Sequence, residues 1–123
     1  MNGRALLDSN VIIDIAKERL DISKINDYSA YAISVITYME TLGYRFGDTN
    51  EKIKIKAILS CFDIVQLDGQ IVETVVKIRQ NNKIKLPDAI IAATALEHNM
   101  VLITNNTKDF ENIITSIVSP YFL

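Results

Sequence analysis

The chain has 123 residues, of which 49% are hydrophobic and 23% are charged, values typical of one globular domain and unlike those of a disordered or fibrous protein. A formal net charge of −2 argues against a protein that holds nucleic acid through an overall basic field. The sequence shows no apolar run of the roughly 18 residues that span a membrane, no signal peptide, and only one cysteine, Cys61. We therefore expect a single domain over residues 1–123 and a cytoplasmic protein without membrane contact.

Short apolar strands alternate with helices along the chain. In chain order, the pattern predicts strand 4–8, helix 10–19, strand 31–34, helix 35–46, helix 48–61, strand 63–67, helix 69–82, helix 87–99, strand 101–104 and strand 116–118. This alternation indicates an α/β fold with a parallel sheet covered by helices on both faces. Ligands of such folds bind beyond the carboxyl ends of the strands, where the strand order reverses.

Capping residues and hydrophobicity refine these predictions. Ser9 or Asn10 is expected to cap the first helix, and Pro87 is expected to begin the last helix with Asp88 beside it. That last helix is apolar nearly all round, so we expect it to be heavily buried. Cys61 is expected to be a small buried apolar residue.

Four acidic residues have positions that place them near the carboxyl edge of the sheet. Asp8 ends the first strand, and Asp109 follows the fourth strand by five residues. Asp88 lies in the first turn of the buried helix, where the positive helix end favours a carboxylate. Glu40 lies at the edge of the predicted core stripe of its helix, which consists of Val35, Met39, Leu42 and Phe46. Each acid alone has an ordinary explanation as a turn, helix-start or surface residue.

Together, the four acids suggest a metal site. Carboxylates that converge at one sheet edge repel one another and raise each other's pKa unless a cation lies among them. The only histidine, His98, is expected at the far end of the last helix, so the donors are all oxygens, which select Mg²⁺ or Mn²⁺. Such an ion lowers the pKa of a bound water and clamps a phosphodiester, which favours a metal-dependent phosphoryl hydrolase.

The basic residues form two groups along the chain. One group consists of Lys52, Lys54 and Lys56, and the other of Lys77, Arg79, Lys83 and Lys85. We interpret both groups as solvated helix faces rather than as tracks for a ligand.

Three segments resemble the signature blocks of PIN-domain proteins, specifically the VapC-type toxins of bacterial toxin–antitoxin pairs. They are LLDSNVIID (6–14), ISVITYMETLGY (33–44) and LPDAIIAATALEHNMVLITNNTKDF (86–110), in the family's order over essentially the whole chain. The resemblance implies a three-layer sandwich with a five-stranded parallel sheet of order 3-2-1-4-5. It also implies an endoribonuclease that hydrolyses RNA phosphodiester bonds with water activated by Mg²⁺ or Mn²⁺, and that is inhibited by a cognate antitoxin.

The resemblance also assigns site residues by position. Many family members carry an acid where this chain has Asn106, so the fourth acidic position is open between Asn106 and Asp109, and we predict Asp109. The predicted catalytic acids are Asp8, Glu40, Asp88 and Asp109, of which Asp8, Asp88 and Asp109 would bind the metal. The predicted supporting polar residues are Ser9, Asn10, Thr104 and Asn106.

We expect the toxin to act in a homodimer or in a toxin–antitoxin hetero-oligomer. Two other functions are alternatives to that of a toxin. A phospho-accepting receiver domain would use Asp68 after the third strand as its acceptor, but it leaves Glu40 and Asp88 without a role. A PIN fold that has weakened as an enzyme and serves to bind partners is favoured by Asn106 in place of an acid.

Overall fold

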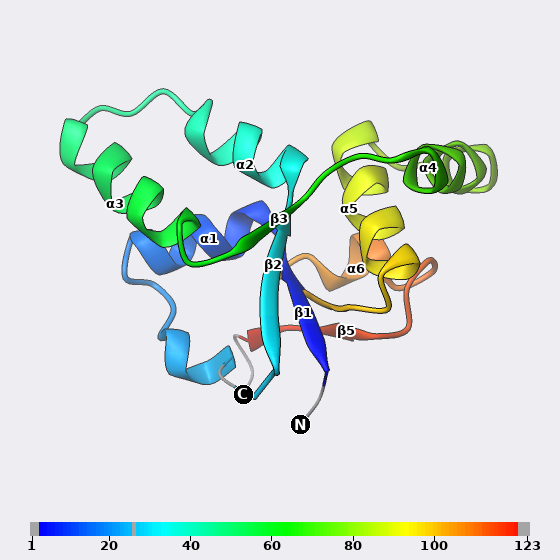
Figure 1. Cartoon of the computed structure of the whole chain (residues 1–123), viewed down its shortest axis with the longest axis horizontal. Helices are drawn as coiled ribbons and strands as arrows, with labels where there is room; N and C mark the ends of the chain where they lie inside the picture. The colour runs from blue at the N-terminus through cyan, green and yellow to red at the C-terminus, as the bar shows by residue number, and fades with distance from the viewer. Residues whose placement is uncertain (1–2, 26, 121–123) are drawn as a thin grey trace.

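The central element of the fold is a five-stranded parallel sheet (Figure 1). The computed structural model describes residues 3–25 and 27–120. The strands are β1 (Arg4–Leu7), β2 (Ala30–Ser34), β3 (Asp63–Val65), β4 (Val101–Ile103) and β5 (Ile117–Val118). Their order, β3-β2-β1-β4-β5 with every pair parallel, confirms the order implied by the resemblance. The chain reverses direction across the sheet at β1, so the carboxyl end of β1 lies where such folds bind ligands.

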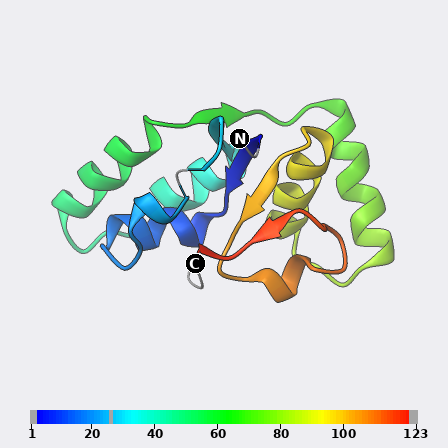
Figure 2. The same cartoon turned by 90° about the horizontal axis from the view of Figure 1, so that it is seen from below.

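Helices cover both faces of the sheet, as predicted from the alternating pattern. One side carries α1 (Ser9–Ala16), α2 (Val35–Leu42), α3 (Thr49–Leu59) and the 3₁₀ helix Ile22–Ile25, and the other carries α4 (Gly69–Asn81) and α5 (Leu86–Glu97). Figure 2 shows these layers from below, with the short helix α6 (Thr107–Phe110) in the connection that leads from β4 to β5. In the described residues, no helix has the length and apolar character that a membrane crossing requires.

Two apolar cores form because successive residues of a strand point to opposite faces of the sheet. Leu6 and Leu102 pack with α4 and α5, whereas Leu7 and Ile103 pack with α1 and α3. The expected burial of the last helix is confirmed, since all residues from 89 to 95 are buried in α5. The hydroxyl of Thr94, the one polar side chain in that run, donates to the Ile90 carbonyl at 2.7 Å and is thereby satisfied.

The structure corrects the prediction for the helix that carries Glu40. α2 ends at Leu42, four residues earlier than expected, and its fully buried side chains are Thr37 and Thr41. Met39, assigned to the core stripe, is 52% exposed. The buried side of α2 lies close to α1, α3 and α5, where small side chains allow close approach, and Thr41 satisfies its hydroxyl on the Thr37 carbonyl at 2.8 Å. Of the predicted stripe, Leu42 and Phe46 do pack against the core, so hydrophobicity alone was wrong for Met39 and missed the two buried threonines.

A second correction concerns Cys61, which is exposed rather than buried. α3 ends at Leu59, so Cys61 lies in the turn that leads to β3.

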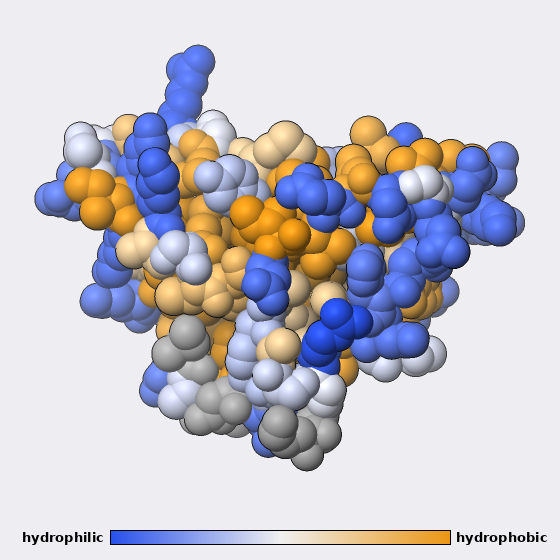
Figure 3. Space-filling model, in the orientation of Figure 1, coloured by the Kyte–Doolittle hydropathy of each residue, from blue (hydrophilic) through white to orange (hydrophobic). Residues whose placement is uncertain are grey.

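Around β3, apolar surface gathers in the middle of the face shown in Figure 3, and Ile64 and Leu67 are 38% and 44% exposed. β3 is an edge strand of three residues and presents few unpaired backbone groups.

Candidate active site

Asp8 occupies the carboxyl end of the central strand and is buried, with 4% of its surface exposed. One carboxylate oxygen accepts from the backbone N–H of Ser9 at 2.7 Å, so the N-cap of α1 is Asp8 and not Ser9 or Asn10 as predicted. The other oxygen accepts from the hydroxyl of Thr104 at 2.8 Å and from the side-chain amide of Asn10 at 3.2 Å. Asp8 is thus a helix cap and a buried site carboxylate at the same time.

The pKa of Asp8 is raised above its ordinary value, chiefly because burial disfavours the charged form. The hydrogen bonds from Thr104, Ser9 and Asn10 act in the opposite direction because they stabilise the carboxylate, and the negative charge of Glu40 raises the pKa further. Three donors therefore hold a carboxylate where solvation is poor and another acid is near.

Glu40 reaches the site from α2 through Ser9. The Ser9 hydroxyl donates to the Glu40 carboxylate at 2.7 Å and lies 3.4 Å from the hydroxyl of Thr37. Because Ser9 directly follows Asp8, this contact brings the second acid to the start of α1. Glu40 is exposed, so its carboxylate remains open to a ligand.

Asp88 lies in the first turn of α5, directly after Pro87. Its side chain is only partly buried, and its pKa is raised by burial first and then by the charges of Asp8, Asp109 and Glu40. The charge of Lys85 acts the other way. The charges of the other three acids proposed from the sequence therefore act on Asp88, although the four acids come from four separate segments.

Asp109 and Asn106 both line a polar pocket of about 510 Å³ that also contains Asp88. Asp109 belongs to α6, and its backbone N–H donates to the Asn106 carbonyl at 3.1 Å. The Asn106 N–H donates to the Thr104 hydroxyl at 3.0 Å, the same hydroxyl that donates to Asp8. The helical turn that follows β4 thus places both candidates for the fourth position beside Asp88.

Asn10 connects the first acid to that loop. Its amide nitrogen donates to Asp8, and its carbonyl oxygen accepts from the Asn105 backbone N–H at 3.3 Å. Together with Thr104, it fixes the segment after β4 to the segment after β1. The supporting roles expected for Ser9, Asn10 and Thr104 correspond to these contacts.

The donors present suit a hard divalent cation by their chemistry, because the acids and the neighbouring amide and hydroxyl groups offer only oxygen ligands. As the side chains stand, the described part of the chain contains no group of three or more His, Cys, Asp or Glu residues positioned to hold one metal ion. Repulsion between carboxylates favours side-chain positions that are further apart. After burial, this repulsion is the next cause of the raised pKa of Asp88.

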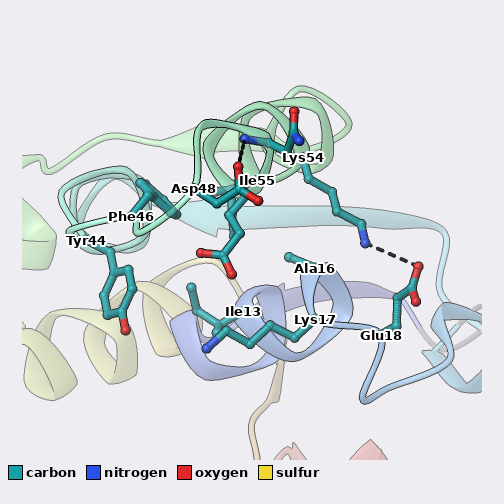
Figure 4. A pocket seen from close by; sticks show the side chains of 11 residues that line it. Ile13, Ala16, Lys17, Glu18, Tyr44, Phe46, Asp48, Lys54 and Ile55 are labelled. Atoms are coloured by element: carbon teal, nitrogen blue, oxygen red, sulfur yellow. Dashed lines mark hydrogen bonds and ion pairs between the residues drawn. The ribbon is translucent and has the colours of Figure 1, made fainter.

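A second pocket, of about 250 Å³, lies between α1 and the segment that leads into α3 (Figure 4). Ile13, Ala16, Phe46 and Ile55 contribute its apolar wall. In Figure 4 Tyr44 stands at one end, and at the other Lys54 reaches Glu18, which it contacts at 3.2 Å. This pocket contains none of the four acids and suits an apolar side chain.

Sequence reasoning missed the lysines next to the acids. Lys83 and Lys85, interpreted as part of a solvated helix face, lie beyond the end of α4 at Asn81 and line the pocket of Asp88 and Asp109, as does Lys108. The signal available in the sequence was the position of Lys83 and Lys85 just before the acid at the start of the apolar helix.

Comparison with known proteins agrees with this geometry. The family model described as the PIN domain matches residues 5–114. The chain belongs to the PIN-domain family. It is 31% identical over 119 residues to Ribonuclease VapC1 of Rickettsia felis, covering 88% of this chain and 89% of that protein.

Solved structures of PIN-domain relatives have the same fold. A toxin–antitoxin complex from Klebsiella pneumoniae contains a chain that is 40% identical, with a TM-score of 0.80 over 95% of this chain and 98% of that one. VapBC-1 from nontypeable Haemophilus influenzae is 28% identical, with a TM-score of 0.75 over 96% of this chain and 98% of that one.

We predict that Asp88→Asn stabilises the metal-free protein at neutral pH. A raised pKa means that the folded state holds the proton of Asp88 more tightly than the unfolded state does. The free energy of unfolding therefore increases as pH falls through the raised pKa and levels off below the ordinary value of 3.8. Removing the charge should raise the free energy of unfolding at pH 7 by up to about 1 kcal/mol and weaken its pH dependence.

Urea unfolding in EDTA at pH 7 and pH 5 measures both effects. Asp63→Asn is the matched control, since it removes an exposed acid from the start of β3. A variant less stable than the parent at pH 7 would show that the charge of Asp88 supports the fold.

Proposed function

We propose that the chain is a metal-dependent endoribonuclease, the toxin of a toxin–antitoxin pair, that hydrolyses RNA phosphodiester bonds. The observation that carries this proposal is the arrangement of the acids: Ser9 joins Asp8 to Glu40 through hydrogen bonds, and Asp88 shares a pocket with Asp109. Membership of the PIN-domain family and relatives named ribonucleases support it. In this proposal residues 1–123 act as one PIN domain in the cytoplasm, where RNA is available.

The residues of the site have separate roles in the proposed reaction. Asp8, Asp88 and Asp109 would hold Mg²⁺ or Mn²⁺, and the donors around Asp8 keep its carboxylate in one orientation. The bound ion would supply a water of lowered pKa and would neutralise charge on the phosphodiester. Glu40, which is exposed and accepts a hydrogen bond from Ser9, would accept a proton from the attacking water.

A second candidate function is a PIN fold with weakened activity that binds partners. It is favoured by Asn106, a neutral amide where many family members have an acid. Against it stands the position of Asp109, which lies in the same pocket as Asn106 and Asp88 and acts on the pKa of Asp88. Cleavage by the parent chain and its dependence on Asp109 separate the two functions.

Asp8→Asn should abolish RNA cleavage and growth inhibition while leaving the fold intact. The amide oxygen can still accept from the Ser9 N–H and cap α1, but the charge that attracts the cation is lost. We expect cleavage of labelled RNA by the purified, antitoxin-free chain to fall by at least about 100-fold in Mg²⁺. Asp14→Asn on α1 is the control, and full activity of Asp8→Asn would refute the assigned role.

Asp109→Asn tests the fourth position. If Asp109 helps to hold the ion, the Mg²⁺ concentration for half-maximal cleavage should rise roughly 10- to 100-fold. Asn106→Asp should lower that concentration if Asn106 is itself a ligand, because hard ions prefer a charged oxygen. Glu111→Gln removes an equal charge two residues beyond Asp109 and serves as the control. Identical Mg²⁺ titrations of the parent and Asp109→Asn would remove Asp109 from the site, and absence of cleavage by the parent would favour the binding module.

An antitoxin that covers the site is the expected partner, in a toxin–antitoxin hetero-oligomer. Solved relatives include toxin–antitoxin complexes. A group of carboxylates with raised pKa is a favourable place for an inserted Arg, whose guanidinium binds a carboxylate with two parallel hydrogen bonds. The apolar pocket between α1 and α3 offers a place for apolar side chains of the same partner.

Antitoxin and Mg²⁺ should therefore compete. We expect the Kd of the cognate antitoxin, measured by calorimetry, to increase with Mg²⁺ concentration, and the Kd of Mg²⁺ to increase by the same factor when antitoxin is bound. NaCl at equal ionic strength controls for general screening. Independent binding of the two would contradict a shared site.

A further inference from the structure

Three lysines line the same pocket as two of the acids. Lys83 and Lys85 come from the connection between α4 and α5, and Lys108 comes from α6, where it precedes Asp109. All three are exposed, and none of them forms an ion pair with another described residue. The pocket therefore presents positive side chains beside the acids without using them to neutralise those acids.

The segment that carries Lys83 and Lys85 is fastened to the body of the protein. Its neighbour Asn82 donates from its side-chain amide to the Ile78 carbonyl at 3.0 Å. The guanidinium of Arg79 donates to the carbonyl of Ile84 at 3.4 Å, and the Ile84 side chain packs against the core. These contacts hold Asn82 and Ile84 against the body of the protein. They therefore restrain the backbone that carries Lys83 and Lys85.

The spacing of the two lysines suits an extended polyanion. Asn82 and Lys85 have extended backbone angles, and Asn82 and Ile84 are less exposed than Lys83 and Lys85. Residues two apart in an extended chain point to the same side and lie about 6.6 Å apart along it. This separation is comparable to that of successive phosphates in an extended single strand. Lys108 provides a third cation from another wall of the pocket.

The charge distribution favours a phosphate ligand. The chain as a whole is acidic, with a net charge of −2, so it does not attract RNA by its overall field. Three like charges near one another repel, and they are relieved by an anion that contacts all of them. The three lysines line the same pocket as Asp88 and Asp109, which places the cations next to the proposed reaction centre.

We propose that Lys83, Lys85 and Lys108 bind the phosphates of the RNA strand that flank the cleaved bond. This inference rests on the proposed function and adds the path of the substrate: the strand follows the 82–85 segment into the pocket and passes α6. The proposed ligand is a single strand, because an unpaired strand can bend its backbone into a pocket beside the acids more readily than a rigid duplex can.

The test compares two triple variants that lose the same number of positive charges. Both are made in an Asp8→Asn background, which is expected not to cleave the RNA during the measurement. One is Lys83→Ala/Lys85→Ala/Lys108→Ala, and the other is Lys52→Ala/Lys56→Ala/Lys77→Ala, on α3 and α4 away from the pocket. The Kd of a fluorescein-labelled single-stranded RNA is measured by anisotropy in Mg²⁺, at NaCl concentrations between about 50 and about 200 mM.

For the pocket variant, we expect the Kd to rise at least about tenfold at low salt and the slope of log K against log[salt] to fall by up to about 2, near 0.7 for each lost phosphate contact. The control variant should keep the parent slope. A third variant, Lys83→Arg/Lys85→Arg/Lys108→Arg, keeps the charges and should keep the affinity, which separates loss of contact from damage to the fold.

An equal effect of both alanine variants, or no effect of either, would overturn the lysine assignment while RNA binding by the background protein stands. No measurable RNA binding by the background protein at low salt, together with no cleavage by the parent chain, would overturn the proposed function as well.

Discussion

The buried carboxylate of Asp8 at the end of β1 is the constraint on which the rest of the site depends. Its backbone N–H continues the ladder to the Ile103 carbonyl of β4 at 2.9 Å, and its side chain begins α1. A buried carboxylate is costly unless its oxygens are hydrogen-bonded, and here the donors come from the segments after β1 and β4. Satisfying this one group therefore ties together the segments that carry Ser9, Asn10 and Asn106.

Crowding of the acids has opposite effects on stability and on the proposed function. Asp8 and Asp88 both have raised pKa values, so their charged forms weaken the metal-free fold at neutral pH. The same repulsion favours any cation that enters the site, whether a divalent ion or a guanidinium. Proteins commonly depart from local stability rules at functional sites, and these acids follow that pattern.

The proposed binding of phosphates by the adjacent lysines would resolve the difficulty that an acidic protein faces with a polyanionic substrate. A net charge of −2 gives no general attraction to RNA, and the acids themselves repel phosphate. Lys83, Lys85 and Lys108 line one pocket with Asp88 and Asp109, so the proposed phosphate-binding and metal-binding groups lie next to each other. Local arrangement of charge, and not its sum, determines what such a surface can bind.

Much of the fold was readable from the sequence because the relevant physics is local. Apolar strands that alternate with helices predict a covered parallel sheet, and the nearly uniform apolarity of residues 89–95 predicts a buried helix. Asp8 could be placed at a strand end and Asp88 at a helix start for the same reason. The resemblance supplied the strand order and the pairing of these acids with Glu40, which periodicity alone does not provide.

The tertiary structure decided which side chains actually meet. Hydrophobicity assigned Met39 to the core, but the close approach of neighbouring helices buries Thr37 and Thr41 instead. The link from Ser9 to Glu40 joins residues 31 positions apart, and that from Thr104 to Asp8 joins residues 96 apart. No local pattern encodes such contacts. Likewise, the sequence pattern assigned Lys83 and Lys85 to a helix face. In the structure α4 ends at Asn81, and the two lysines line the pocket. The path of the chain between two elements could not be predicted locally because it depends on packing across the whole domain.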